Sequence, residues 1–298
     1  MRCLQPILHC YEQIKPLIEK GQFIYRAVSW PDKPMKKEQL SYPPALKLGA
    51  YGRANRPHAP LFYGSAGCHS TIMEIAPNLG DRLAISKWRL QQNLNIAVAG
   101  YTEKTFSGKA GMNRWPGITW AKQHAEDHRA KQHAEDHRAK NPVNQFVHEF
   151  LAHEFTKKVP QRKAWQYKIS AAFCELLLNA YALELNGEAA SEISGILYPS
   201  TPNEVSADNL AIRPNIADTH LEFISVQYVE ISQKTNEPQY SMRGLDFADT
   251  LSEAGEIQWK NMFPQQLIAG TDHVIKVREQ FIDIVDTKGI SVGSFPLP

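Results

Sequence analysis

The sequence is dominated by short runs of β-branched, aromatic and aliphatic residues that are set off by glycine, proline and asparagine. Runs of this kind in the first hundred residues are 23–28, 61–63, 82–88 and 95–98. Similar runs return late in the chain, at 196–198, 210–212, 221–231 and 273–285. Their length and composition predict β-strands. Between these two groups of predicted strands, apolar residues recur at helical spacing. The resulting order of strands, helices and strands predicts an α+β fold.

Helical periodicity occurs in three places. Apolar residues at helical spacing up to about Lys20 predict an N-terminal helical segment over residues 1–21. The segment 70–76 predicts a short helix that is capped by Ser70 or Thr71 and carries Glu74 beside a strand. A longer helix is expected to start at Asn141–Pro142, and a second one to run from about 165 to 185.

Charge and composition exclude several classes of protein. The 33 basic and 31 acidic residues leave a net charge of +2, so direct nucleic-acid binding is not expected and any anionic ligand must be held locally. No apolar run reaches the roughly 18 residues of a membrane span, and the N-terminus lacks an export signal. The four cysteines fit neither a metal knuckle nor a disulfide framework. We therefore expect a soluble cytoplasmic protein without a membrane partner.

Histidine-rich segments do not predict a metal site. Residues 122–139 are a nine-residue unit repeated in tandem, almost without apolar residues, and are interpreted as a charged insertion that forms a solvated helix or loop. Its histidines at i, i+4 lack a specified third ligand. His148 and His153 are five residues apart, which puts them about 140° apart on a helix and excludes the zinc-protease motif. The glycine motifs of ATPases and Rossmann enzymes, and the nucleophile elbow of α/β-hydrolases, are absent.

Two charged residues lie within apolar segments. Arg26 lies inside the apolar run 23–28, where burial is costly unless the guanidinium meets an anion. It is therefore either a structural ion-pair member or a ligand for an anion. Glu74, flanked by Met73 and Ile75, is either the buried partner of an arginine or a catalytic carboxylate. The residues alone leave both choices open.

Taken in order, the motifs of the first two hundred residues resemble the RES domain family, which is named after its arginine, glutamate and serine. The matching positions are Arg26 after Tyr25, Arg53 in Gly-Arg-Ala-Asn, Tyr63 in Phe-Tyr-Gly-Ser, Glu74, Ser200 in Gly-Ile-Leu-Tyr-Pro-Ser, and Asn209. The resemblance covers residues 22–213, including the insertion at 122–139. Residues 214–298 are expected to form a β-rich C-terminal extension packed on the same domain.

The resemblance implies a fold and an activity. RES proteins are similar in fold to ADP-ribosyltransferases, with a mixed β core and flanking helices. Members degrade NAD, some by phosphorolysis, and others ADP-ribosylate a protein. The chain is thus expected to consume NAD as substrate by cleaving the nicotinamide–ribose bond, with phosphate or water as acceptor and no further cofactor. The alternatives are a mono-ADP-ribosyltransferase acting on a protein and a non-catalytic binding protein.

The resemblance also implies roles for the matching residues. Glu74 would stabilise positive charge on the ribose, Arg26 and Arg53 would bind the pyrophosphate or inorganic phosphate, and Tyr63 would stack on the nicotinamide or the ribose. Ser200 would hydrogen-bond the ribose or an incoming phosphate, and Tyr25 and Asn209 would complete the binding site. A toxin of this family would pair with an Xre-type antitoxin. The residues of the extension leave open whether it extends the sheet, covers a sheet edge or makes a homodimer contact.

Overall fold

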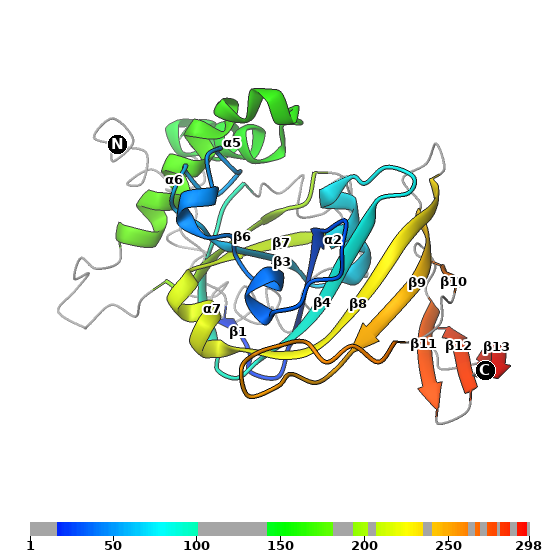
Figure 1. Cartoon of the computed structure of the whole chain (residues 1–298). Helices are drawn as coiled ribbons and strands as arrows, with labels where there is room; N and C mark the ends of the chain where they lie inside the picture. Colours follow the sequence, from blue (N-terminus) through cyan, green and yellow to red (C-terminus); the bar gives the residue numbers. More distant parts are fainter. Residues whose placement is uncertain are drawn as a thin grey trace, which may run out of the picture.

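The computed structural model describes residues 17–100, 142–180, 193–201, 207–234 and 240–261, and the backbone of four further strands between 266 and 296. The predictions for residues 1–16 and for the repeat at 122–139 lie outside the described residues. Figure 1 shows a mixed α+β arrangement in which helices flank a large sheet.

Within the described residues, ten strands form one mixed sheet in the order β1-β5-β6-β7-β3-β2-β4-β8-β9-β10. Neighbouring strands run antiparallel except for β5 and β6, which are parallel. The bounds are β1 (Leu17–Ile18), β2 (Phe23–Ser29), β3 (Phe62–Ser65), β4 (Arg82–Leu90), β5 (Leu94–Val98), β6 (Gly195–Pro199), β7 (Asp208–Ile212), β8 (Leu221–Lys234), β9 (Tyr240–Ala248) and β10 (Gln266–Ile268). All the strands expected between residues 23 and 231 are therefore confirmed.

The sheet is weakly joined between β2 and β3. β2 pairs with β4 along its whole length, from Phe23 to Ser29, but with β3 only through Tyr25 and Ser65. The single pair divides the sheet into one half made of β1, β5, β6, β7 and β3 and another made of β2, β4, β8, β9 and β10. The two halves separate beside residue 26, and this opening positions the site described below.

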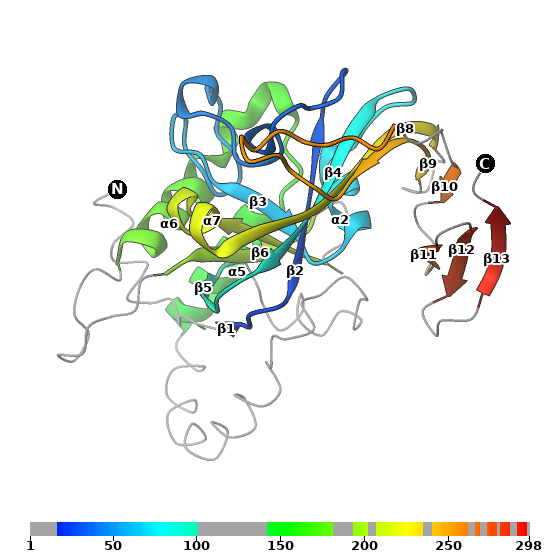
Figure 2. The same cartoon turned by 60° about the horizontal axis from the view of Figure 1, so that its bottom comes forward.

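Helices pack against both halves of the sheet. The helical elements are α2 (Cys68–Ile75), α5 (Pro142–Thr156), α6 (Lys168–Ala180) and α7 (Pro214–His220), with 3₁₀ turns η2 (Lys37–Leu40), η3 (Ala45–Lys47) and η4 (Gln161–Tyr167). α2 contacts β2 and β3, and α5 and α6 contact each other and β6. Figure 2 shows α5 and α6 on the side of β5 and β6, away from β8 and β9. None of the described helices is long and apolar enough to cross a membrane.

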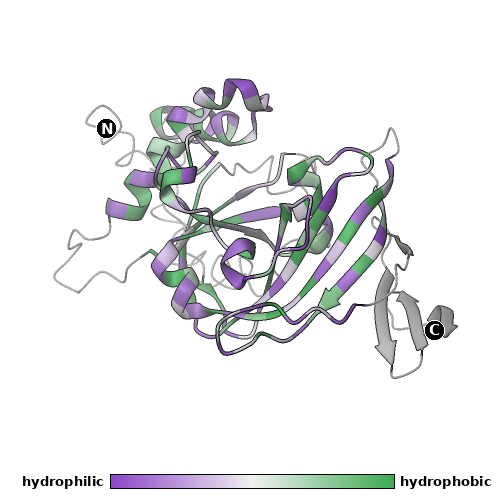
Figure 3. Cartoon of the chain, in the orientation of Figure 1, coloured by the Kyte–Doolittle hydropathy of each residue, from purple (hydrophilic) through white to green (hydrophobic). Residues whose placement is uncertain are grey.

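Alternation of apolar and polar residues along the strands builds separate apolar clusters, and it is visible along β4 and β8 in Figure 3. The largest cluster lies on one side of the sheet, where the Trp88 ring packs edge-on against Phe62 at 5.5 Å and Phe223 at 5.7 Å. A second cluster lies under α5 and α6 around Phe155 and Phe173. A third lies under α2 and includes Ile72 and Met73.

Some sequence predictions were wrong. Leu17 and Ile18, expected in a helix, form β1 and pair with Asn95 and Leu94, because the edge of β5 offers backbone partners that outweigh the local pattern. α2 begins at Cys68 with Gly67 at the N-cap position and without a side-chain cap, so Ser70 and Thr71 lie inside the helix and do not cap it. The helix α7 and the strand β9 were not predicted.

The end of the chain forms a separate sheet. β11 (His273–Arg278), β12 (Phe281–Asp286) and β13 (Ser291–Pro296) pair antiparallel. The β-rich run at 273–285 is thus two strands. The turn expected at 286–289 falls between β12 and β13, and residues 287–290 lie outside the described residues. After residue 213, β8 and β9 continue the same sheet as β2 and β4.

Candidate active site

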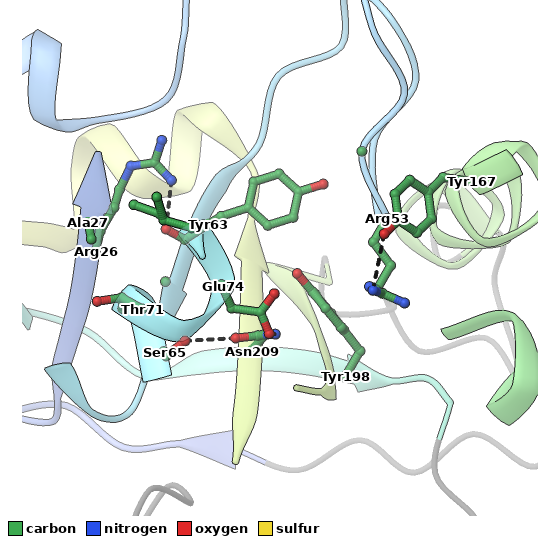
Figure 4. A pocket seen from close by; sticks show the side chains of 13 residues that line it. Arg26, Ala27, Arg53, Tyr63, Ser65, Thr71, Glu74, Tyr167, Tyr198 and Asn209 are labelled. Carbon is green, nitrogen blue, oxygen red and sulfur yellow. Dashed lines mark hydrogen bonds between the residues drawn. The ribbon is translucent and has the colours of Figure 1, made fainter. Parts of the chain in front are cut away.

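A cavity of about 300 Å³ lies where β2 and β3 separate (Figure 4). Its walls come from β2, β3, β6, β7, α2, η4 and the loop around Gly52. The residues that line it are Arg26, Ala27, Gly52, Arg53, Tyr63, Gly64, Ser65, Thr71, Glu74, Ile75, Tyr167, Tyr198 and Asn209. Two arginines and one glutamate give this lining a formal charge of +1, which is a local excess of positive charge in a nearly neutral chain.

One oxygen of the Glu74 carboxylate is held by two neutral donors. The Ser200 hydroxyl donates to Glu74 Oε1 at 2.6 Å, and the Asn209 side-chain amide donates to the same oxygen at 2.6 Å. Ser200 and Asn209 are buried, whereas Glu74 is exposed at the last turn of α2. No described residue bonds Oε2. The carboxylate is therefore fixed in orientation with one oxygen available to a ligand.

A row of polar residues across the sheet supports this carboxylate. Tyr25 on β2 pairs with Ser65 on β3, Ser65 with Asn209 on β7, and Asn209 with Tyr198 on β6. Directly paired residues point their side chains to the same face of a sheet. As a result the Ser65 hydroxyl donates to Asn209 Oδ1 at 2.7 Å, which leaves the amide nitrogen to face Glu74 (Figure 4). The strand register thus orients the carboxylate through Asn209.

Arg26 fills the gap between β2 and β3. Its Nη1 donates to the backbone oxygen of Tyr63 at 2.7 Å, its Nε donates to the oxygen of Ser41 at 3.1 Å, and the guanidinium lies 5.4 Å from the ring centre of Phe62. Burial lowers the pKa of Arg26 to about 10, so it stays charged at neutral pH. A guanidinium has five N–H groups, and two are used here. Among the described residues no carboxylate forms an ion pair with it.

Arg53 reaches the cavity from the opposite side in the view of Figure 4. Its Nη1 donates to the oxygens of Phe155 and Lys157, at the end of α5, and its Nη2 donates to the Tyr167 hydroxyl at 3.2 Å. The guanidinium also stacks on the Tyr167 ring at 4.9 Å. These bonds stabilise the terminal carbonyls of α5, and they leave Arg53 fewer N–H groups for a ligand than Arg26. It too has no ion-pair partner in the described part of the chain.

Tyr63 is held by the loop before β3. Its hydroxyl donates to Asn55 Oδ1 at 2.6 Å and accepts from the backbone nitrogen of Ala54 at 3.1 Å. Burial raises the pKa of Tyr63, so the phenol stays neutral. A Cβ added to Gly52 would lie 2.2 Å from Asn55 Oδ1 and 2.9 Å from the Tyr63 hydroxyl. A glycine is therefore required at residue 52 for this close packing.

The residues predicted for the site come together in large part. Arg26, Arg53, Tyr63, Glu74 and Asn209 line the cavity, and Ser200 contacts it through its bond to Glu74. Tyr25 belongs to the supporting row but does not line the cavity; its ring lies 5.9 Å from the Lys87 ammonium group.

Sequence reasoning missed two aromatic residues of the site. Tyr167 lies at the end of the 3₁₀ turn η4, within the segment predicted as a helix from about 165, where nothing sets it apart as a site residue. Tyr198 lies in the buried strand β6, whose sequence is typical of a core. The signal that could have identified Tyr198 is its phenol group in an otherwise aliphatic strand. Within the described ranges, no group of three or more potential metal ligands comes together.

Comparison with known proteins adds no relative. No family model matches the chain, and no curated protein matches it significantly. Functional assignment therefore depends on the motifs and on the geometry of the cavity.

Proposed function

We propose that the chain is an NAD-consuming enzyme of the RES type, which cleaves the nicotinamide–ribose bond and passes the ADP-ribosyl group to phosphate or water. The observation that carries the proposal is the Glu74 carboxylate, which Ser200 and Asn209 fix through one oxygen. The same cavity is lined by two arginines that form no ion pair with any described residue. We also propose an ADP-ribosyltransferase-like fold. This is supported by the separation of β2 and β3 beside Arg26, because the separation opens a ligand site between the two halves of the sheet.

The chemistry requires a negative charge near the sugar. As the bond from the ribose carbon to the nicotinamide nitrogen breaks, the electron pair leaves with nicotinamide, which becomes neutral, and the ribose acquires oxocarbenium character. A phosphate oxygen, or a water that then loses a proton, supplies the electron pair of the new bond. Glu74 Oε2 would stabilise the transient positive charge by electrostatics and accept a hydrogen bond from a ribose hydroxyl. No covalent bond to the enzyme is needed.

The arginines fit the other end of such a substrate. Arg26 retains three N–H groups that no described residue accepts, which suits the oxygens of a pyrophosphate or an incoming phosphate. Arg53, whose nitrogens are mostly bound to α5 and Tyr167, would contribute charge more than hydrogen bonds. The cavity of about 300 Å³ is at the lower end of ligand pockets, so it would hold the reacting end of the dinucleotide.

Product analysis tests the proposal. The purified protein is incubated with NAD, with and without phosphate, and nicotinamide and the ADP-ribosyl product are identified by chromatography and mass spectrometry. We expect nicotinamide release, with ADP-ribose 1-phosphate as the second product if phosphate is the acceptor and ADP-ribose if water is. Labelled NAD with cell extract would reveal a modified protein band instead if the acceptor is a protein.

A pair of variants ties the activity to Glu74. Glu74→Gln keeps an oxygen for Ser200 and Asn209 but removes the charge, and we expect its turnover to fall by about 100-fold or more. The control is Glu175→Gln, which removes a carboxylate that pairs with Arg56 at 3.0 Å outside this cavity. Equal turnover in the two variants, or no nicotinamide release from the wild type under any condition, would contradict the proposal.

A further inference from the structure

Tyr198 combines a deeply buried ring with a hydroxyl group that bonds no residue in the described part of the chain. Its side chain is 4% exposed, and its ring packs against Phe155 with ring centres 6.0 Å apart in the cluster under α5 and α6. The ring thus has a packing role that a phenylalanine could also fill. The hydroxyl needs a separate explanation.

The Tyr198 hydroxyl forms no hydrogen bond with any residue that the structure describes. Tyrosines at buried positions usually pair their hydroxyl group with a protein group. The neighbouring Tyr63 follows this rule, since its hydroxyl is bound to both Asn55 and Ala54. Figure 4 shows the Tyr198 hydroxyl pointing into the cavity, toward the space between Tyr63 and Glu74.

Strand register fixes this position relative to the carboxylate. Tyr198 on β6 is the direct partner of Asn209 on β7, whose amide binds Glu74 Oε1. Both side chains therefore project from the same face of the sheet, and Tyr198 lies beside the group that holds the carboxylate. A ligand that reaches Glu74 Oε2 would also meet this hydroxyl.

We propose that the Tyr198 hydroxyl is a substrate-contacting group, which donates a hydrogen bond to an oxygen of the sugar–phosphate part of the ligand next to Glu74. This inference rests on the proposed function and adds a contact to it. Burial, together with nearby Tyr63 and Glu74, raises the pKa of Tyr198 well above its ordinary value. The group is consequently a neutral donor throughout the neutral range, and it suits an oxygen acceptor rather than a cation.

The test compares two tyrosine-to-phenylalanine variants that differ only in their location. Tyr198→Phe removes the hydroxyl and keeps the ring. Tyr240→Phe is the control, because Tyr240 is also 4% exposed but lies on β9 in the cluster under α2, outside the cavity. The measurements are kcat and KM for NAD, the affinity for ADP-ribose by isothermal titration calorimetry, and the thermal midpoint of each variant.

We expect Tyr198→Phe to lower kcat/KM by about tenfold and to weaken ADP-ribose binding, with a thermal midpoint close to that of the wild type. Tyr240→Phe should change neither kinetics nor binding. If the wild type cleaves NAD but Tyr198→Phe keeps wild-type kcat/KM and ADP-ribose affinity, this inference is overturned while the proposed function stands. A loss of activity that disappears after correction for the folded fraction overturns it as well. A wild type that neither cleaves NAD nor binds ADP-ribose overturns both.

Discussion

Replacing Asn209 by aspartate tests whether the Glu74 carboxylate is held as the structure shows. Asn209 is 3% exposed, and its amide nitrogen lies 2.6 Å from Glu74 Oε1. In Asn209→Asp an oxygen takes the place of that nitrogen, while the other oxygen can still accept from Ser65. The substitution therefore changes almost no volume but places a second carboxylate against the first.

The size of the effect follows from the separation of the two charges. Carboxylates that touch through one oxygen each have charge centres about 4 Å apart, and two unit charges at that distance repel by about 1 kcal/mol in water and about 4 kcal/mol near a protein surface. Because Glu74 is exposed, the true value lies between these limits. One carboxyl of the pair should then have its pKa raised by about one to three units from the ordinary value near 4.

The sign of the pH dependence is set by this raised pKa. Below about pH 4 both the folded and the unfolded variant carry the proton, and a shared proton can replace the amide hydrogen in the bond to Glu74. As pH rises from about 4 to about 7, the unfolded variant loses its proton first and the folded variant loses it later, against the repulsion, so the variant loses stability relative to the wild type. We expect a deficit that grows by about 1 to 4 kcal/mol over this window.

Urea unfolding of the wild type, Asn209→Asp and Asn209→Ala at several pH values between 4 and 8 measures this deficit. Asn209→Ala loses the same hydrogen bonds without adding a charge, so its deficit should depend on pH much less than that of the aspartate variant. If the difference between the aspartate variant and the wild type stays constant across the range, Asn209 does not face the Glu74 carboxylate and the geometry of the site is refuted.

Three further predictions concern other parts of the chain. Gly52→Ala should lower the free energy of unfolding by about 1 to 3 kcal/mol in urea titrations, because its Cβ would collide with Asn55 Oδ1 at 2.2 Å, whereas Gly49→Ala, with open space around its Cβ, should change little. Phe155→Ala, at a fully buried position, should lower the free energy of unfolding by about 3 to 5 kcal/mol. If this free energy falls by less in Phe155→Ala than in Gly52→Ala, the cluster under α5 is loosely packed. Burial raises the pKa of Cys68 to about 11. Iodoacetamide at pH 8 should therefore label Cys68 far more slowly in the folded than in the urea-unfolded protein, as measured by peptide mass spectrometry. The free energy of unfolding, measured by urea titration, should fall as pH rises from about 9 to 11.

Local sequence signals predicted the strands better than the helices. The runs at 23–28 and 82–88 form β2 and β4 because their residues suit a pleated, half-buried surface. Leu17 and Ile18 became a strand because β5 was available beside them, which depends on residues almost eighty positions away. α7 was missed although Pro214 begins it, since proline at the first helical position was not used as a start signal.

From the sequence, the residues of the candidate site could be predicted only as a set of short motifs in a particular order. Arg26 and Glu74 stand out because charged groups in apolar segments need partners, whereas Ser200 is marked only by the resemblance. What no motif contains is the strand register, and the register decides that Asn209 lies between Ser65 and Tyr198. For Tyr198 the sequence offers only a phenol group in an otherwise aliphatic strand, and the fold shows that its hydroxyl faces the cavity.

The register also changes the role of two predicted residues. Ser200 was expected to contact the ribose or the phosphate and Asn209 to complete the binding site, yet both direct their donors at Glu74 Oε1. Two neutral donors on one oxygen fix the plane of the carboxylate without neutralising its charge, which an ion pair with Arg26 would do. Both arginines are instead held by backbone carbonyls, so charges of both signs persist in one cavity. The proposed substrate, with a cationic ring at one end and a pyrophosphate at the other, would require charges of both signs held apart in this way.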